Sequence, residues 1–227
     1  MEQSPGPDTS WARRPLAGLG RRVLLMGVLK PVIAAYTRPR VFHAERLKSV
    51  TPPMVLAANH ASHLDTPVIM QSLPKPHRYR TGVVAAADYF FRSRPKAWFV
   101  SLAFATLPIE RKEISATTRK RIDRMIDEGW NVLLFPEGTR TTDGTMGRLR
   151  SGAAYMATQY HLPLVPVYLT GTHEAMPKGS DWPRRHPVTI RFGEPLYPPS
   201  DGDHRYLQDQ LLNAFDKLAA EAGEPAP

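Results

Sequence analysis

The alternation of short apolar runs with longer helical patterns constrains the fold of this chain more than any other feature. Runs of five or six residues, rich in aliphatic and β-branched side chains, have the length and composition of buried strands. They lie at 53–58, 82–87, 105–109, 131–135, 164–169 and 188–192. Helical patterns lie at 62–72, 115–128, 150–159 and 203–222. Strands separated by helices predict an α/β fold with a central, mostly parallel or mixed sheet flanked by helices.

The length of 227 residues suits one α/β domain with an appendage. We predict a disordered tail at 1–10, a basic amphipathic helical element at 11–48, the main domain at 49–222 and a second disordered tail at 223–227.

Positive charge is concentrated near the N-terminus. The chain has a formal charge of +9, and residues 11–48 alone hold nine Lys and Arg against one Glu. A basic segment on a nearly neutral body indicates a polyanionic partner, either nucleic acid or an anionic membrane surface.

The segment 16–36 is apolar but interrupted. Its longest uncharged run is 23–29, after which come Lys30 and Pro31. A membrane span needs about 20 apolar residues, and a secretory signal needs an unbroken apolar region, so neither fits. Pro31 should kink the helix. A second apolar run, 97–109, is also too short to span and is expected to form a buried helix–strand pair.

One face of this N-terminal helix is apolar. Its residues are Leu25, Leu29, Val32 and Ile33. We favour a helix lying in the bilayer interface, with its basic residues at the level of anionic headgroups. An ordinary amphipathic helix packed on the domain is the alternative.

A His–Asp pair follows the first predicted strand. In the segment NHASHLD, His60 precedes Asp65 by five residues. Ser62 is a suitable helix N-cap, which would put Asp65 in the first turn and let its carboxylate reach back to the imidazole. A carboxylate on one ring nitrogen fixes the tautomer and makes the other nitrogen a general base. An incidental His beside a helix cap is the alternative.

The chain contains a second pair with the same spacing, His204 and Asp209. Both fall within one predicted helix, where five residues leave the side chains roughly 140° apart, so this pair cannot form. His63 is expected to be a surface or packing residue. With no Cys and no G-x-S-x-G motif, we expect His60 to deprotonate a hydroxyl of a bound substrate in a direct transfer or hydrolysis.

Other predicted strand ends carry anion-binding residues. The sequence PEGTR at 136–140 combines a glycine, which lets backbone amides approach a ligand, with an arginine suited to phosphate. Arg111 and Lys112 follow the strand at 105–109, and a helix near residue 151 offers further amides. Each could instead be a solvated turn, but their convergence with His60 favours a site.

Together these segments resemble the glycerolipid acyltransferase family, which is typified by 1-acylglycerol-3-phosphate acyltransferases. The family has four ordered sequence blocks, and each has a counterpart here. They are a His-x4-Asp box preceded by Asn, a Pro–apolar–x–Arg block, FPEGTR and an apolar–Pro block. In this chain they are 59–65, 108–111, 135–140 and 164–167. The third block departs from the family only at Thr141, where serine is usual.

The resemblance implies a mechanism and a set of site residues. His60 acts as general base with Asp65 orienting it, and the acceptor hydroxyl attacks an acyl thioester of coenzyme A or acyl carrier protein directly. Arg111 holds the acceptor phosphate. The acceptor site is shaped by Glu137, Gly138, Thr139 and Arg140. No cofactor or metal is implied, and the N-terminal helix docks on the membrane.

The predicted function is therefore acylation of 1-acylglycerol-3-phosphate (lysophosphatidic acid) to phosphatidic acid. The expected setting is the cytoplasmic face of a membrane, with anionic lipids and not nucleic acid as partners. Alternatives are the same chemistry on glycerol-3-phosphate, another lysophospholipid or an amino-lipid, an acyl-thioester hydrolase, and a non-catalytic module that binds anionic lipid or nucleic acid.

Overall fold

The structure is a computed structural model that describes residues 6–90, 93–110 and 114–223. The strands are β1 (Arg40–Phe42), β2 (Val55–Ala58), β3 (Thr81–Ala86), β4 (Leu107–Ile109), β5 (Asn131–Leu134), β6 (Leu164–Thr170) and β7 (Thr189–Phe192). The α-helices are α1 (Pro15–Val23), α2 (Lys30–Thr37), α3 (Asp65–Ser72), α4 (Lys75–Arg78), α5 (Ala87–Phe90), α6 (Arg94–Phe104), α7 (Ala116–Asp127), α8 (Gly152–Gln159), α9 (Thr172–Ala175) and α10 (His204–Ala222). Short 3-10 helices η1 (Ser10–Arg13) and η3 (Ala44–Ser49) and a π-helical segment η2 (Leu24–Leu29) complete the described elements.

The strands of the described residues form a mixed sheet in the order β1-β7-β6-β2-β5-β3-β4. Strands β6, β2, β5, β3 and β4 are parallel to one another. Strand β7 is antiparallel to β6, and β1 pairs in parallel with β7 at the edge. The parallel strands therefore end at the same edge of the sheet, where ligands bind in open α/β sheets.

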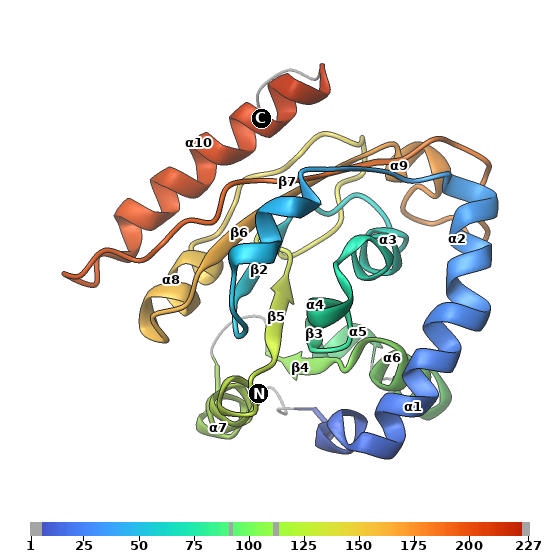
Figure 1. Cartoon of the computed structure of the whole chain (residues 1–227). Helices are drawn as coiled ribbons and strands as arrows, with labels where there is room; N and C mark the ends of the chain where they lie inside the picture. Colours follow the sequence, from blue (N-terminus) through green and yellow to red (C-terminus); the bar gives the residue numbers. More distant parts are fainter. Residues whose placement is uncertain (1–5, 91–92, 111–113, 224–227) are drawn as a thin grey trace.

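Helices cover both faces of the sheet (Figure 1). Because successive side chains of a strand point to opposite faces, Val55 and Ala57 of β2 pack with α7, α8 and α10. Their neighbours Leu56 and Ala58 pack with α3, η3 and the N-terminal helices. The predicted α/β fold with a flanked mixed sheet is confirmed.

The six predicted strands are present with ends shifted by up to two residues, whereas β1 was not predicted. The helix–strand pair expected at 97–109 exists as α6 and β4, but it is not fully buried. Trp98 is 57% exposed and Phe99 is 42% exposed, because one side of α6 faces solvent.

Segments α1, η2 and α2 follow one another as a long rod along one side of the molecule (Figure 1). Pro31 lies in the first turn of α2 and has no N–H, and the amide of Lys30 instead donates to the carbonyl of Leu25, five residues earlier. The break expected at Pro31 thus takes the form of a π-helical segment before it. Within the described residues, no helix combines the length and apolarity needed to cross a bilayer.

Most of the face of the rod that we expected to enter the bilayer packs on the domain instead, whereas its residue Val32 is 42% exposed. Leu25 and Ile33 are fully or almost fully buried in the core beneath α3, and Leu29 packs against the same cluster. For Leu25, Leu29 and Ile33 the prediction is wrong, because the rod is apolar on two sides and the side with these residues packs on the domain. The rod and β1 make residues 11–48 part of the same packed structure as the predicted domain at 49–222.

Two further N-terminal features differ from expectation. Arg21 is buried, donating to the carbonyls of Ala12 and Leu102, and desolvation lowers its pKa to about 10. It therefore does not face headgroups. Residues 1–5 of the expected tail lie outside the described residues, but Thr9 is buried and its hydroxyl donates to the carbonyl of Thr106 at 2.6 Å. The tail predicted at 1–10 is thus at least partly ordered.

Candidate active site

The predicted site residues lie where the parallel strands end. His60 follows β2 by two residues, and the segment 135–140 follows β5, the neighbour of β2. Asn59 fixes the end of β2, because its side-chain amide donates to the carbonyl of Leu169 on β6 at 2.9 Å and accepts from the Leu169 amide at 2.8 Å. This pairing continues the β2–β6 ladder by one step and places His60 just beyond it.

His60 and Asp65 form the predicted pair. The distance from His60 Nδ1 to Asp65 Oδ2 is 2.7 Å, and Asp65 is completely buried. Because a carboxylate accepts, Nδ1 carries the proton and Nε2 is the basic nitrogen. The imidazole also stacks on Phe135, with ring centroids 3.9 Å apart. These contacts hold His60 in one orientation at the wall of a cavity.

The turn before α3 aims the Asp65 carboxylate. Oδ2 also accepts from the backbone amides of Ala61 and Ser62, both at 2.8 Å. The Ser62 hydroxyl accepts from the Leu64 amide, but regular helix begins at Asp65, so Ser62 is not the N-cap residue that we expected. Of the two capping-box hydrogen bonds, only the one from the Ser62 amide to the Asp65 carboxylate forms, because the amide of Asp65 donates to the Ser62 carbonyl instead of the hydroxyl.

Glu137 braces the backbone of the site. One carboxylate oxygen accepts from the amide of His60 at 2.6 Å and the other accepts from the amide of Gly147 at 2.8 Å. Burial raises the pKa of Glu137 to about 7, against the opposing effect of these hydrogen bonds. Among the described residues, Glu137 does not line the cavity. It therefore supports the predicted acceptor site through its hydrogen bonds to the backbone of His60 and Gly147.

The other FPEGTR residues reach the cavity directly. Gly138, Thr139 and Arg140 line it, and the amide of Thr141 donates to the carbonyl of His60 at 2.9 Å. Gly138 has φ of 74°, a conformation that favours glycine. Because Thr141 is hydrogen-bonded to the His60 backbone, its sequence neighbour Arg140 is held close to His60.

The predicted phosphate ligand Arg111 lies outside the described residues. Its neighbour Glu110 is buried at the cavity wall and accepts from the Ser115 hydroxyl at 2.8 Å. The second predicted anion ligand at this strand end, Lys112, also lies outside the described residues.

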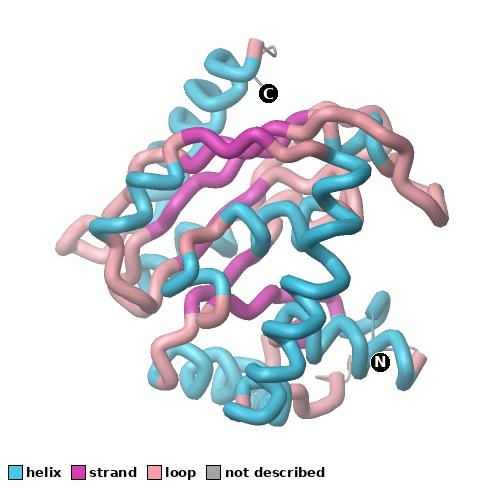
Figure 2. Tube along the Cα trace, turned by 45° about the vertical axis from the view of Figure 1, so that its right-hand side comes forward, coloured by secondary structure: helices cyan, strands magenta, loops and turns pink. Residues whose placement is uncertain are grey.

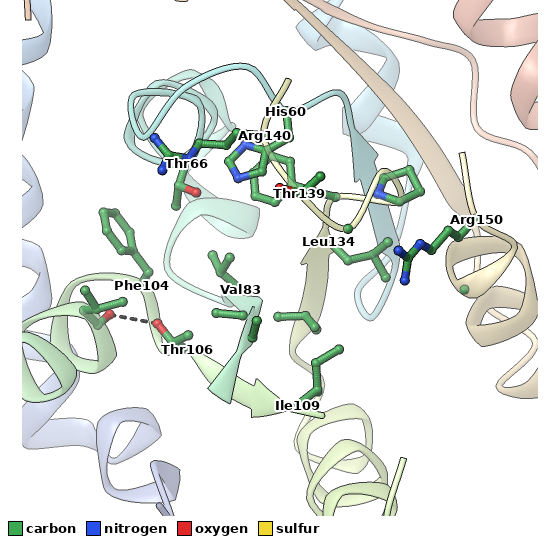
Figure 3. A pocket seen from close by; sticks show the side chains of 18 of the residues that line it. His60, Thr66, Val83, Phe104, Thr106, Ile109, Leu134, Thr139, Arg140 and Arg150 are labelled. Carbon is green, nitrogen blue, oxygen red and sulfur yellow. Dashed lines mark hydrogen bonds between the residues drawn. The ribbon is translucent and has the colours of Figure 1, made fainter. Parts of the chain in front are cut away.

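The cavity has a volume of about 670 Å³ and combines two environments. Below His60 it is apolar, bounded by Val83, Phe104, Ile109 and Leu134 (Figure 3). Cationic side chains also line the cavity, on more than one side of His60. These are Lys96, Arg140, Arg150 and Lys178.

Several cavity residues were not predicted. His63 lines the cavity rather than the surface, and burial together with the nearby positive charge of Arg140 lowers its pKa to about 4. Lys96 and Lys178 carried no sequence signal, because they come from α6 and from the loop after α9, outside every motif. Arg150 lies just before the helix start that we predicted near residue 151. No other sequence feature pointed to it as a cavity residue.

The partly exposed His60 pairs with the buried Asp65 at the edge of a mixed α/β sheet, beside a cavity lined by apolar and cationic side chains, as the resemblance to glycerolipid acyltransferases implies. The family model described as "Acyltransferase" matches residues 38–170. The chain belongs to this acyltransferase family.

Named relatives and a solved structure agree with this assignment. The chain is 31% identical over 158 residues to the chloroplastic 1-acyl-sn-glycerol-3-phosphate acyltransferase BAT2 of Brassica napus, covering 67% of this chain and 43% of that protein. It is 33% identical over 145 residues to the 1-acyl-sn-glycerol-3-phosphate acyltransferase of Limnanthes douglasii, covering 63% of this chain and 50% of that protein. The chain thus spans about half the length of the curated relatives it matches. The crystal structure of the 1-acyl-sn-glycerophosphate (LPA) acyltransferase PlsC from Thermotoga maritima has the same fold, with a TM-score of 0.66, 19% identity, and coverage of 93% of this chain and 87% of that chain.

Proposed function

We propose that this protein transfers a fatty acyl group from acyl-CoA or acyl carrier protein to the free hydroxyl of lysophosphatidic acid, giving phosphatidic acid. The observation that carries the proposal is the His60–Asp65 pair beside a cavity lined by both apolar and cationic side chains. Such a cavity suits a substrate with an acyl chain at one end and a phosphate at the other.

In the proposed reaction, His60 Nε2 takes the proton of the acceptor hydroxyl while the oxygen attacks the thioester carbonyl. The C–O bond forms, the C–S bond breaks, and the imidazolium returns the proton to the departing thiolate. Asp65 stabilises the transient positive charge on the imidazole, and its fixed position sets the tautomer. No step requires a cofactor or a metal.

Arg140 and Arg111 are the proposed ligands of the acceptor phosphate, with Gly138 and Thr139 shaping the same part of the cavity. An arginine matches phosphate geometry, and Arg140 is tied to the His60 backbone through the neighbouring Thr141. The apolar part of the cavity would hold an acyl chain.

An exposed apolar stripe on the N-terminal rod is the proposed membrane contact. The N-terminal stripe consists of Leu16, Leu19, Val23, Val28 and Val32. The π-helical turns of η2 bring Val28 nearer to the side of Val23 than an α-helix would, which keeps the stripe on one side of the rod. It shares only Val32 with the face expected from the sequence.

Helix α6 extends this surface toward the cavity. It packs against α1 and exposes Trp98, which stacks on Trp11, and Phe99. Its residues Val100 and Phe104 line the cavity. A lipid tail could therefore pass from the bilayer along α6 to His60.

The proposed location is the cytoplasmic surface of a membrane with anionic lipids, with the protein bound peripherally. Exposed cations beside the N-terminal stripe support contact with anionic headgroups. They are Arg14, Arg22 and Lys30. Nucleic acid is not a proposed partner.

The direct experiment is incubation of the purified protein with labelled acyl-CoA and a panel of lysolipid acceptors. We expect labelled phosphatidic acid to form from lysophosphatidic acid faster than any other product. Faster transfer to glycerol-3-phosphate or another lysolipid would assign a different acceptor. Release of free fatty acid without any acceptor would instead indicate a hydrolase.

A further inference from the structure

Two arginines flank His60 on different sides of the cavity. In Figure 3, Arg140 lies beside Thr66 near the α3 side, whereas Arg150 lies beyond the end of β5 next to α8. Arg140 belongs to the motif whose role was expected from the sequence. Arg150 has no role in the mechanism described so far.

Arg150 is held in place by its backbone and by a glycine. Its amide donates to the carbonyl of Pro136 at 2.9 Å. Its guanidinium packs on Gly138, where an added Cβ would lie only 3.2 Å from Arg150 Cζ. Among the residues that the structure describes, none forms an ion pair or a hydrogen bond with the Arg150 guanidinium, although it lines the cavity.

The proposed direct transfer brings two phosphate-bearing substrates to one base. In lysophosphatidic acid, the phosphorus is separated by only two atoms from the carbon that bears the reacting hydroxyl, so the acceptor phosphate must lie close to His60. Arg140 suits this role because its segment is hydrogen-bonded to the His60 backbone. Lys178 donates to the Arg140 carbonyl at 3.4 Å and adds a second cation on that side.

The donor phosphate needs a separate position. In acyl-CoA and in acylated carrier protein, the same phosphopantetheine arm joins the thioester sulfur to a phosphate at its far end. The acceptor phosphate lies close to His60 whereas the donor phosphate lies at the far end of the arm, so different cations suit the two phosphates. A guanidinium away from the acceptor side but within the same cavity meets the requirement for the donor phosphate.

We infer that Arg150 binds the phosphate of the phosphopantetheine arm of the acyl donor, and that this contact separates donor from acceptor in the cavity. The inference rests on the proposed function, because it assumes direct transfer of the acyl group from donor to acceptor. Its chemical content, a phosphopantetheine phosphate site at Arg150, can be tested without any acceptor.

The test compares octanoyl-CoA with octanoyl-pantetheine, which has the same thioester and lacks the phosphate. Arg150→Gln should lower kcat/KM for octanoyl-CoA about tenfold or more, the effect of losing a charge-assisted hydrogen bond. It should leave kcat/KM for octanoyl-pantetheine unchanged, and the KM for lysophosphatidic acid unchanged.

Arg148→Gln is the matched control. Arg148 is exposed on the same loop, does not line the cavity and carries the same charge. This variant should behave as wild type with both donors. Equal losses with both thioesters in Arg150→Gln, a rise in acceptor KM alone, or equal effects of the two substitutions would overturn the inference.

Two further arms separate the possible outcomes. With octanoyl-carrier protein, Arg150→Gln should again lower kcat/KM, and an unchanged value would mean that Arg150 contacts the nucleotide of CoA instead, which contradicts the inference.

Calorimetric binding of free CoA should weaken in Arg150→Gln and not in Arg148→Gln. If no lysolipid is acylated yet CoA binding depends on Arg150, the proposed function fails and this inference stands. Unchanged CoA binding in Arg150→Gln would overturn the inference. Thermal melts of all variants verify folding.

Discussion

A single carboxylate oxygen of Asp65 organises both the His60 imidazole and the turn that presents it. It accepts from the ring of His60 and from two consecutive backbone amides. Three donors on one buried oxygen fix the position of the carboxylate, as a general-base pair needs. The pairing could be predicted because the five-residue spacing falls across a turn, whereas the pair His204–Asp209 falls within α10.

The role of the Glu137 side chain could not be predicted from the sequence. A glutamate in a loop beside a base and an arginine is readily interpreted as a substrate ligand. In the structure both of its oxygens accept from the backbone amides of His60 and Gly147. Sequence cannot reveal this, because the choice depends on where the loop at 141–147 returns.

His63 gives a pH prediction. Its pKa falls from the ordinary value of 6.5 to about 4 in the folded protein because burial disfavours the charged ring. Between these values the unfolded chain binds a proton that the folded protein does not, so stability falls as the pH falls through this window. We expect the unfolding midpoint of the wild type to drop more steeply from about pH 6.5 to about pH 4 than that of His63→Gln.

The comparison of these two proteins isolates His63. The raised pKa of Glu137 acts in the opposite direction, adding stability as the pH falls from about 7 toward 4.5, but it contributes equally to both. Thermal melts at matched ionic strength give the two slopes. Parallel slopes would contradict a buried, neutral His63.

At the scale of elements, the N-terminal rod shows why periodicity alone does not identify a membrane face. One side buries Leu25 and Ile33 in the core, and the opposite side exposes the N-terminal stripe. Both sides are apolar in the sequence, so only packing distinguishes them. The π-helical segment, which shifts the register of the two sides, also has no clear sequence signature beyond Pro31.

Membrane binding through the N-terminal stripe is testable by vesicle flotation. The double substitution Leu19→Ser and Val23→Ser removes exposed apolar area without touching the core, since these residues are 63% and 64% exposed. We expect about thirtyfold weaker binding to vesicles containing anionic lipid, since each of the two substitutions costs about 1 kcal/mol of buried apolar surface.

Leu212→Ser is the control for this experiment. Leu212 is a partly exposed residue of α10, which lies on the far side of the molecule from α1 (Figure 1). It should leave flotation unchanged. Wild-type binding by the double variant, or a comparable loss in the control, would show that a different surface contacts the bilayer.

At the scale of the whole molecule, the class of fold was predictable and its topology was not. Short apolar runs such as 131–135 predict buried strands, and the helices between them predict that these strands pair in parallel. The edge strand β1 escaped prediction because its three residues are exposed and begin with Arg40. Strand order, which puts β2 between β5 and β6, depends on long-range pairing.

The whole arrangement connects the proposed membrane surface to the candidate active site. Figure 2 shows the N-terminal helices crossing one side of the sheet, and α6 connects their exposed surface to the cavity. Only part of the positive charge in residues 11–48 is available to the proposed membrane contact, because Arg21 is buried and Arg46 pairs with Glu194. The motifs could be located from sequence, whereas the cavity that joins them required the fold.

The central claim is that His60 is the general base for direct acyl transfer, and turnover of His60→Ala with acyl-CoA and lysophosphatidic acid tests it most directly. We expect about a 10³-fold loss of kcat with an unchanged thermal midpoint, whereas His204→Ala, from the pair that cannot form, retains wild-type turnover. Near-normal turnover in a folded His60→Ala protein would contradict the account.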